Sequence, residues 1–339
     1  MNICFIADSW ENMDPEIEST LRIVHEACKR GHRVCMCKPG NLTIRENVSY
    51  SFCRIIQKND KISESIPSFY KKVKFRKQML PLNGFDVIFL RKNPPLDNVM
   101  LNFLDSVKHD VFIVNDIDGL RKASNKIYVT SFENAHEFIP ETYVSRDVNY
   151  LESVINDSKK DKMILKPLDG YGGSGVIVLE TKAKASIRSL LEFYIGQDRH
   201  YVMLQEYIEG AEKGDVRVMM LNGEPIGAMK RVPKEGDARS NVHAGGTASK
   251  HVLTRKEAEL CRKIGQKLVI DGIYFAGLDI IEGKLIEVNV MSPGGITRIN
   301  KFNKTNLQRK ILDFLELVCK KKEDALNRRF AFKKAIDDA

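Results

Sequence analysis

Residues 163–180, MILKPLDGYGGSGVIVLE, combine the residue types best suited to chemistry in this chain. An apolar run leads to Lys166, a glycine-dense loop follows, and a second apolar run begins at Val176. Backbone N–H groups of glycines can approach phosphate oxygens closely, and an ammonium at the end of a buried strand can be aimed at the same ligand. The stretch therefore predicts a strand–loop–strand unit that handles phosphate, with a plain glycine-rich turn as the alternative. The loop positions are Gly170, Gly172, Gly173, Ser174 and Gly175.

Three of these glycines also match the G-x-G-x-x-G pattern of dinucleotide-binding folds. That pattern requires a helix directly after the glycines, so that a pyrophosphate lies at the helix N-terminus. Residues 176–179 are instead a β-branched run typical of a strand. No Lys-Ser or Lys-Thr follows the glycines, which also argues against a Walker P-loop. A flexible lid over nucleotide phosphates fits best, and an oxidoreductase using a dinucleotide is set aside.

A second group of chemistry-bearing residues lies in 274–295, YFAGLDIIEGKLIEVNVMSPGG. A Glu-Gly turn divides this stretch into a hairpin, with Asp279 on the first strand and Glu287 and Asn289 two residues apart on the second. The three side chains would therefore share one face of the sheet. Two carboxylates and an amide oxygen form an incomplete hard ligand set that suits Mg²⁺ completed by ATP phosphates and water. Acidic residues in an exposed hairpin are the ordinary alternative, but these lie among apolar residues, where a carboxylate needs a partner.

Two further cations are candidates because of their positions. Arg91 follows a strand expected at 85–90, and open α/β sheets bind ligands at the carboxyl ends of their strands. It could grip a substrate carboxylate, or it could be an ordinary loop arginine. Lys126 lies on a helix expected near 124–132 and could reach phosphates from the side opposite Lys166. Its position alone is more typical of a surface lysine.

The first part of the chain alternates strands and helices, which predicts an open parallel sheet covered by helices, a Rossmann-like domain over residues 1–120. The expected strands are 2–7, 33–37, 85–90 and 111–114, and the expected helices are 16–30 and 96–107. The segment 41–82 is polar, lysine-rich and weakly patterned. It is expected to be a peripheral insertion without chemistry.

Shorter elements from residue 121 predict a small α+β lobe over 121–204 that contains the glycine loop, and a larger lobe over 205–320 that contains the metal hairpin. The larger lobe also holds Asn222-Gly223, the strongest short turn signal in the chain. Its segment 233–249 has no periodicity, and a long loop of this kind is usually a lid or a binding loop. A last helix is expected at 306–319, followed by a charged tail over 321–339 of mixed helical propensity.

The composition is that of a soluble globular protein, because 43% of the 339 residues are apolar and 29% are charged. No apolar run approaches the roughly 20 residues that span a bilayer, and the first residues lack a secretion signal, so a cytoplasmic location without a membrane is expected. The net charge of +9 is spread along the chain. Small anionic substrates explain it as well as nucleic acid does, and nucleic-acid binding would rest on charge alone.

The seven cysteines are scattered through apolar stretches and odd in number, which predicts reduced core thiols rather than a disulfide framework. Cys35 and Cys37 share one strand face near His32. No second pair completes a zinc set there, so a metal role is not expected.

Taken together, the motifs resemble those of the ATP-grasp ligases, and within that superfamily those of the bacterial glutathione synthetases. The resemblance covers residues 1 to about 318, with the motifs in the family's order. The motifs that carry it are RKNPPLD (91–97), ILKPLDGYGGSGV (164–176), QEYI with KGDVRV (205–218), NGEPIGAMKRVP (222–233), NVHAGGTAS (241–249) and GLDIIEGKLIEVNVMSPGGI (277–296). An ATP-grasp fold behind a Rossmann-like N-terminal domain is what this resemblance implies.

The resemblance also implies a role for each matching position. ATP phosphates would be held by Lys126 and Lys166 under the lid of Gly172, Gly173, Ser174 and Gly175. The adenine would bind at Gln205, Glu206, Tyr207 and Ile208, and the ribose hydroxyls at Asp215. Mg²⁺, or alternatively Mn²⁺, would bind at Asp279, Glu287 and Asn289. The catalytic cations would be Arg217 and Arg231, and the substrate-binding positions Arg91, Arg239, Ser292, Gly294 and Gly295.

The implied activity is the ATP-dependent joining of γ-glutamylcysteine to glycine through an acyl phosphate, in a homo-oligomer such as a tetramer. One loop departs from the family, which commonly reads Ser-Pro-Thr-Gly-Ile-Arg-Glu where this chain has Ser292-Pro-Gly294-Gly-Ile-Thr297-Arg298. The departure leaves open a ligase for another dipeptide or amino acid. A nucleotide-binding regulatory protein without catalysis is a further alternative, against which the retained carboxylates, lysines and Arg231 argue.

Overall fold

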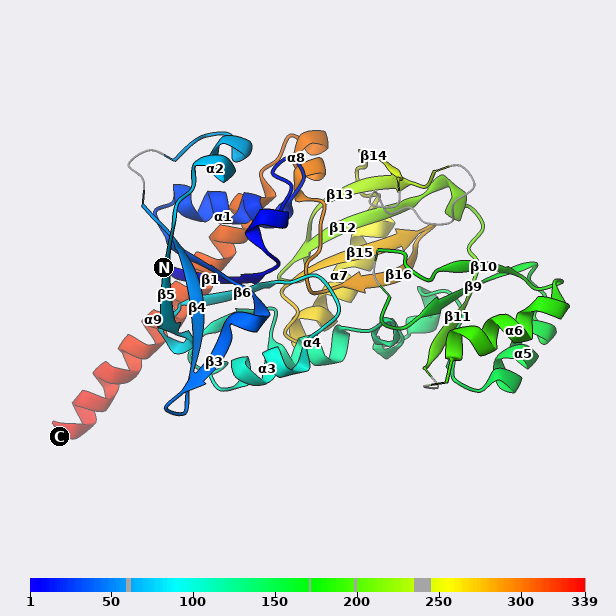
Figure 1. Cartoon of the computed structure of the whole chain (residues 1–339), viewed down its shortest axis with the longest axis horizontal. Coiled ribbons are helices and arrows are strands. Elements are labelled where there is room, and N and C mark those ends of the chain that lie inside the picture. The colour runs from blue at the N-terminus through cyan, green and yellow to red at the C-terminus, as the bar shows by residue number, and fades with distance from the viewer. Residues whose placement is uncertain (59–61, 171, 198–199, 235–244, 339) are drawn as a thin grey trace. The chain divides into compact units, whose positions relative to one another are not determined.

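The computed structural model describes residues 1–58, 62–170, 172–197, 200–234 and 245–338 (Figure 1). The chain divides into two compact units. The first unit comprises Met1–Asn93, Asp97–Ile117 and Lys304–Ala339, and the second comprises Pro94–Leu96 and Asp118–Asn303.

A parallel sheet forms the centre of the first unit, with strand order β2-β1-β6-β7. Its strands are β1 (Asn2–Ala7), β2 (Arg33–Cys37), β6 (Val87–Arg91) and β7 (Phe112–Val114), and the connecting helices include α1 (Ser19–Lys29) and α3 (Asn98–Asp105). Helix α4 (Ile117–Ala123) belongs to the second unit from Asp118 onward. Helix α1 ends before Gly31, whose φ of +79° suits glycine. The predicted Rossmann-like arrangement is confirmed.

Residues 41–82 extend this sheet, so the expected unpatterned insertion is wrong. They form β3 (Leu42–Arg45), β4 (Val48–Ile56), α2 (Ile66–Lys72) and β5 (Phe75–Pro81). Strand β4 pairs antiparallel with β2, and both β3 and β5 pair with β4.

The reason that β4 escapes sequence reasoning is the direction of its side chains. Its inward-facing residues include Ser49 and Ser51, which are 4% and 0% exposed, whereas Phe52 on the opposite face is 55% exposed. A half-buried strand is recognised by apolar residues on its inner face. Here the first two inward positions are serines and only Cys53 and Ile55 further along are apolar, so the alternation gives a weak signal.

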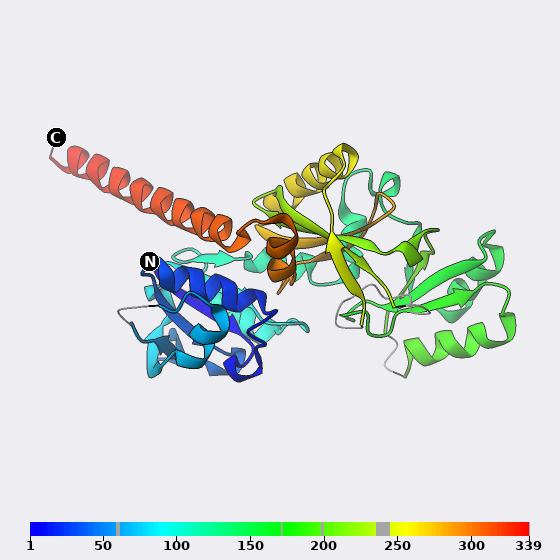
Figure 2. The ribbon, with the colours of Figure 1, turned by 90° about the horizontal axis from the view of Figure 1, so that it is seen from above.

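Helix α9 (Leu307–Asp337) belongs to the first unit and runs without interruption through the expected tail (Figure 2). Its first turns bury Leu307, Ile311 and Leu315, and Arg30 beyond α1 donates hydrogen bonds to Asp313 at 2.8 Å and Glu316 at 2.9 Å. The helix expected at 306–319 is confirmed, and it continues through the charged segment that follows as far as Asp337. No glycine or proline follows position 307, and the Lys, Glu, Arg, Ala and Leu content favours continued helix.

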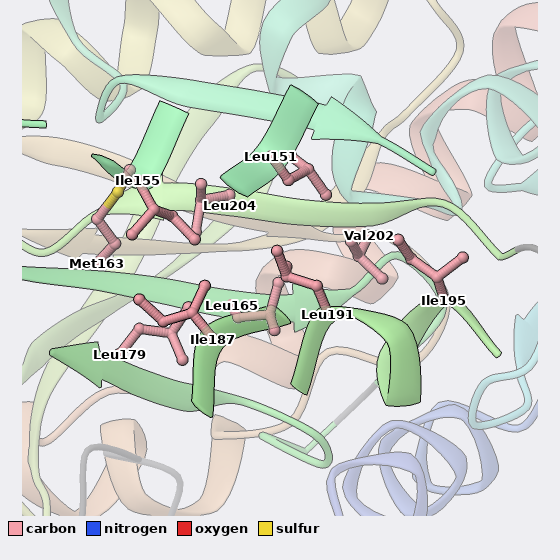
Figure 3. Close-up of a cluster of buried hydrophobic side chains, with 10 residues drawn as sticks. All are labelled: Leu151, Ile155, Met163, Leu165, Leu179, Ile187, Leu191, Ile195, Val202 and Leu204. Carbon is pink, nitrogen blue, oxygen red and sulfur yellow. The ribbon is translucent and has the colours of Figure 1, made fainter. Parts of the chain in front are cut away.

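The second unit contains a four-stranded antiparallel sheet of order β10-β9-β11-β8. Its strands are β8 (Thr142–Ser145), β9 (Lys162–Pro167), β10 (Ile177–Glu180) and β11 (Val202–Glu206), and its helices are α5 (Val148–Asp157) and α6 (Lys184–Ile195). Figure 3 shows the core that these elements share, including Leu165 and Leu204 side by side on neighbouring strands. Because strand side chains alternate, the adjacent Lys166 and Gln205 point to the opposite face.

A five-stranded antiparallel sheet of order β14-β13-β12-β15-β16 completes the second unit. Its strands are β12 (Asp215–Leu221), β13 (Glu224–Val232), β14 (Thr247–Lys250), β15 (Phe275–Ile281) and β16 (Lys284–Asn289), with helices α7 (Arg255–Ile270) and α8 (Ile296–Asn303). The predicted turns are confirmed: both residues of Asn222-Gly223 (φ 47° and 83°) and of Glu282-Gly283 (φ 45° and 77°) have the positive φ of a type I′ hairpin.

Among the described residues, no helix combines the length and the apolar content needed to cross a membrane. The helix expected at 124–132 is a short 3-10 helix, Lys126–Ser131, whose first residue is the candidate lysine.

Candidate active site

Four buried charges on three neighbouring strands form one ion-pair network. On β12, Arg217 donates from Nε to Oδ1 of Asp279 at 2.5 Å and from Nη2 to Oδ2 at 2.9 Å. On β13, Arg231 donates to both carboxylate oxygens of Asp215, at 2.7 and 2.6 Å, and its Nη2 also lies 2.9 Å from Oδ1 of Asp279. All four residues are at most 7% exposed. These bidentate pairs hold both guanidinium groups in fixed orientations.

The network keeps its charges at neutral pH. Burial opposes ionisation of Asp279, but Arg217 and Arg231 outweigh it and lower the pKa of this carboxyl to about 2. Burial likewise opposes the charge of Arg231, while Asp279 and Asp215 outweigh it and raise the arginine pKa. Burial and the neighbouring Asp279 raise the pKa of Asp215, while Arg231 and Arg217 act in the opposite direction. The charges of Asp279 and Arg231 therefore stand at a site shielded from water, where electrostatic interactions are strong.

The three predicted metal ligands lie together as expected. Asp279 and Glu287 are register partners across β15 and β16, and Asn289 donates from Nδ2 to Oδ2 of Asp279 at 3.1 Å. A 180° turn of that amide would present its oxygen instead. Within the described part of the chain, no cluster of three or more His, Cys, Asp or Glu side chains is arranged for a metal. Two carboxylates and an amide fit Mg²⁺, which commonly completes its shell with phosphates and water.

The two candidate lysines approach the same carboxylates from other elements. Lys126 is 9% exposed, contacts the carbonyl oxygen of Gly170, and places Nζ 3.6 Å from Oε1 of Glu287. Lys166 on β9 donates to Oε1 of Gln205 at 2.8 Å, and Gln205 in turn donates to Oγ1 of Thr142 at 2.8 Å. Lys126 is therefore not an ordinary surface lysine.

Burial lowers the pKa of Lys166 to about 8. The neighbouring Lys126 lowers it further, while Glu287 and Asp279 act in the opposite direction. A lysine of lowered pKa that faces carboxylates in a buried site is typical of a functional site.

The described part of the glycine loop has the backbone expected of a flexible lid. Gly172, Gly173 and Gly175 adopt φ of 62°, 78° and 70°, a region that glycine occupies without strain. Ser174 is exposed, and Tyr194 on α6 donates to the carbonyl oxygen of Gly175 at 3.0 Å. The strand β10 after the loop confirms the strand–loop–strand prediction.

The segment predicted to bind adenine, 205–208, begins with the last two residues of β11 and continues beyond the strand. Glu206 forms an ion pair with Lys160 at 2.7 Å, and the hydroxyl of Tyr207 donates to Glu212 at 3.5 Å. The carbonyl oxygen of Ile208 accepts from the N–H of Ala211 at 3.1 Å.

The loop that departs from the family lies against the ion-pair network. Arg217 donates from Nη1 to the carbonyl oxygen of Gly294 at 3.3 Å, and Ser292 beside it is half-buried. A Cβ at Gly294 would meet nothing within 4 Å. At Gly295, φ is 124° and a Cβ would lie 3.0 Å from Cε of Met229. The backbone of this chain therefore favours glycine at 295, because of its positive φ, whereas a side chain at 294 would enter open space.

The remaining substrate candidates are Arg91 and Arg239. Arg91 belongs to the first unit, where it is 2% exposed and donates from Nε to Oγ1 of Thr20 at 3.2 Å. Burial lowers its pKa to about 10. Arg239 lies outside the described residues. Sequence reasoning missed Thr142, because its contact with Gln205 depends on the register between β8 and β11.

Solved structures identify the fold of this chain as that of the ATP-grasp ligases. The D-cycloserine synthetase DcsG is similar with a TM-score of 0.63 at 13% identity, covering 94% of this chain and 99% of that one. The D-alanine-D-alanine ligase from Coxiella burnetii is similar with a TM-score of 0.60 at 9% identity, covering 98% and 99%. An ATP-grasp ligase, PsnB, solved with Mg and ADP, has a TM-score of 0.57 at 13% identity, covering 94% and 98%.

Two family models match nearly the whole chain. The N-terminal domain of prokaryotic glutathione synthetase matches residues 1–121, and its ATP-grasp domain matches residues 125–304. The chain is 34% identical to the glutathione synthetase of Gloeobacter violaceus, covering 93% of this chain and 96% of the relative, and 34% identical to that of Agrobacterium fabrum, covering 96% and 98%. The chain therefore belongs to the prokaryotic glutathione synthetase family. It is an ATP-dependent carboxylate–amine ligase of glutathione formation, in a class that generally uses ATP and Mg²⁺.

Proposed function

We propose that this enzyme converts the cysteine carboxylate of γ-glutamylcysteine into an acyl phosphate. The amine of glycine then attacks the acyl carbon and displaces phosphate. The observation that supports this most directly is the buried network of Arg217, Arg231, Asp215 and Asp279 beside Glu287. It sets two oriented cations next to a carboxylate pair suited to a nucleotide-bound metal.

ATP binding is assigned to the cations and backbone groups around that network. Lys126 and Lys166 bind the phosphates beneath the 172–175 loop, residues 205–208 hold the adenine, and Asp215 accepts hydrogen bonds from the ribose hydroxyls. A carboxylate has about four lone-pair positions, so the two bonds from Arg231 leave acceptor capacity at Asp215.

Asp279, Glu287 and Asn289 are proposed to hold Mg²⁺, with Mn²⁺ as a substitute. The bound ion neutralises phosphate charge and orients the transferred group. The low pKa of Asp279 keeps that ligand ionised at neutral pH.

No protein nucleophile is needed for this chemistry. The donor carboxylate attacks the γ-phosphorus and ADP leaves; the amine then attacks the acyl carbon and phosphate leaves. Arg217 and Arg231 position and neutralise the oxygens of both groups, because positioning and charge stabilisation supply most of the catalysis in phosphoryl transfer.

The acyl phosphate must be kept from water, which is the role proposed for the glycine lid and for the loop containing Arg239. Arg91, Arg239, Ser292, Gly294 and Gly295 are proposed to contact the dipeptide and glycine.

A cytoplasmic location is supported by the seven free thiols. A homotetramer without nucleic-acid partners completes the proposal, and light scattering coupled to gel filtration would measure its mass.

The decisive experiment measures ADP release from Mg-ATP with γ-glutamylcysteine, with and without glycine, and identifies the product by mass. A glycine-dependent signal that yields the tripeptide supports the proposal. ADP release only with another amino acid or another carboxylate would identify a ligase of different specificity. Absence of ADP with every acceptor would favour a nucleotide-binding protein without catalysis.

The lowered pKa of Lys166 predicts that the enzyme takes up a proton when ATP binds above about pH 8. The folded-state pKa of about 8 lies below the ordinary 10.5, so free enzyme holds fewer protons than the unfolded chain between these values, and stability rises with pH across that window. Phosphates favour the ammonium and raise its pKa again. Calorimetry at about pH 8.5 in buffers of different ionisation enthalpy should therefore show uptake, whereas about pH 6.5 should show none at this group.

Lys166→Arg, which stays protonated, should abolish this uptake. Lys182→Arg is the matched control, because the Lys182 side chain is 84% exposed and forms an ion pair with Asp161. Equal uptake in wild type and Lys166→Arg would show that another group titrates.

Gly294→Thr is expected to fold as well as wild type, since its Cβ enters open space, and to change kcat/KM for the dipeptide or glycine by about tenfold with KM for ATP unchanged. Gly295→Thr should cost more than about 1 kcal/mol of stability, because of its positive φ and the contact with Met229. Thermal unfolding and steady-state kinetics measure both effects. Equal loss of stability in the two variants would contradict this assignment.

A further inference from the structure

Four cysteines gather on one face of the sheet in the first unit. Cys4 on β1 is the register partner of Cys35 on β2, and Cys37 lies two residues further along β2 on the same face. Strand β4 pairs with β2 through Met36↔Arg54, so the register continued by one residue sets Cys53 opposite Cys37. The Sγ atoms of Cys4 and Cys37 are 3.7 Å apart.

This thiol cluster, Cys4, Cys35, Cys37 and Cys53, has neither of the usual structural explanations. All four residues are free cysteines in the described structure. No group of three or more metal-ligating side chains is arranged for a metal among the described residues, so zinc does not account for it. What remains is thiol chemistry or simple core packing.

A pocket of about 680 Å³ reaches two members of the cluster, Cys37 and Cys53. The lining residues all belong to the first unit and include Lys38, Arg54 and Lys77 together with Asp8 and Glu11. Glu11 pairs with Arg54 at 2.5 Å, and the three cations still outnumber the two carboxylates at the wall, which favours anionic ligands. A positive setting is typical of reactive cysteines. The remaining thiols, Cys4 and Cys35, are both 0% exposed and are not lining residues.

The pKa values of the four thiols in the cluster are shifted in different directions. Hydrogen bonds from Cys35, Cys37 and Cys4 lower the pKa of Cys53, whereas the pKa of each of those three is raised. Outside the cluster, burial raises the pKa of Cys28 to about 12 and that of Cys319 to about 11. Within the cluster, Cys53 is thus the thiol whose pKa is lowered, and the thiolate is the nucleophile in disulfide exchange.

We propose that Cys53 and Cys37 form a redox-active pair, reached through this pocket, that exchanges with a low-molecular-weight anionic disulfide. The Cys53 thiolate attacks one sulfur of the small disulfide, forming a mixed disulfide and releasing one small thiolate. Cys37, deprotonated, then attacks Sγ of Cys53, which forms the Cys37–Cys53 bond and releases the second small thiol. One disulfide is reduced to two thiols while two protein thiols are oxidised. Directly opposed strand residues have Cα atoms about 4.5–5.5 Å apart, within the range of about 4.4–6.8 Å that a disulfide spans.

The first test needs only the wild-type protein. At about pH 7, iodoacetamide should label Cys53 at least about tenfold faster than Cys28 or Cys319, measured by mass spectrometry of peptides over time. Solvent exposure alone predicts the opposite order, because Cys28 and Cys319 are half-buried while Cys53 is 1% exposed. Faster labelling of Cys28 or Cys319 would overturn the proposal.

The second test uses glutathione disulfide as the probe, followed by blocking of free thiols and digestion without reduction. A cross-linked peptide pair containing Cys37 and Cys53 is expected. Cys37→Ser should stop at the mixed disulfide on Cys53, Cys53→Ser should form neither product, and Cys28→Ser should behave as wild type. A cross-link between Cys4 and Cys37, or no product in wild type, would overturn the pair even if a serine variant fails to fold.

Discussion

Glu287→Gln is expected to lower Mg-dependent ADP formation by at least about 10²–10³-fold, because it removes one of two carboxylates proposed to hold the ion. Glutamine keeps the size and one oxygen of Glu287, and Lys126 retains its contact with the carbonyl of Gly170, so the fold should be unaffected. The measurement is ADP release over a range of Mg²⁺ concentrations. The dependence should shift to higher Mg²⁺ as well as to lower maximal rate.

Glu282→Gln is the matched control for this variant. It makes the same change in the same hairpin, at an exposed turn position rather than in the row with Asp279. The control should show wild-type turnover. If Glu287→Gln also turned over normally at low Mg²⁺, Glu287 would not be a ligand.

Replacement of Arg231 is expected to lower kcat by about 10²–10³-fold while ATP affinity changes little. The reason is that Arg231 is proposed to stabilise negative charge that develops only in the transition state. The structure determines which replacement can show this. Arg231→Ala would leave Asp215 and Asp279 buried with one cation fewer, and breaking a buried pair costs about 3–5 kcal/mol. Arg231→Lys keeps the positive charge and removes only the planar, bidentate geometry.

The measurements for Arg231→Lys are kcat, the affinity for a non-hydrolysed ATP analogue, and thermal unfolding. Arg262→Lys serves as the control. Arg262 lies on α7, its side chain is 53% exposed, and it pairs with Glu224, which lies on β13 as Arg231 does. A loss of ATP affinity as large as the loss of kcat would make Arg231 an ATP-binding residue rather than a catalytic one. A wild-type kcat would remove it from the site.

The thiol pair and the ligase site lie in different units of the chain and are tested by separate readouts. Cys53 labelling requires no ATP, and ADP release requires no oxidant. Failure of the ligase assay would therefore leave the redox proposal standing, and the reverse also holds.

Local features of the fold could be predicted from sequence because their causes are local. The turns at Asn222-Gly223 and Glu282-Gly283 have positive φ at both residues, which short polar residues and glycine adopt readily. The second of these turns sets the register of β15 and β16, and with it the pairing of Asp279 with Glu287. The strand after the glycine loop was likewise readable from its β-branched residues.

Two elements could not be predicted, for different reasons. In strand β4, Ser51 faces inward and Phe52 faces outward. This reverses the usual pattern of a half-buried strand, in which apolar residues face inward and polar residues face outward. In α9 the apolar periodicity stops near residue 319 while the helix continues to Asp337, since helix propensity without a buried face leaves little pattern to detect.

The sequence by itself determined the class of this protein and the residue types of its site, because glycine loops, turns and alternating carboxylates act over a few neighbouring positions. Only the tertiary structure decided which charges meet. Arg231 joins Asp215 across 16 positions and Arg217 joins Asp279 across 62, and strand β4, which carries Cys53, pairs with strand β2, which carries Cys37. Such contacts depend on strand register and packing between distant segments, which local patterns along the chain do not encode.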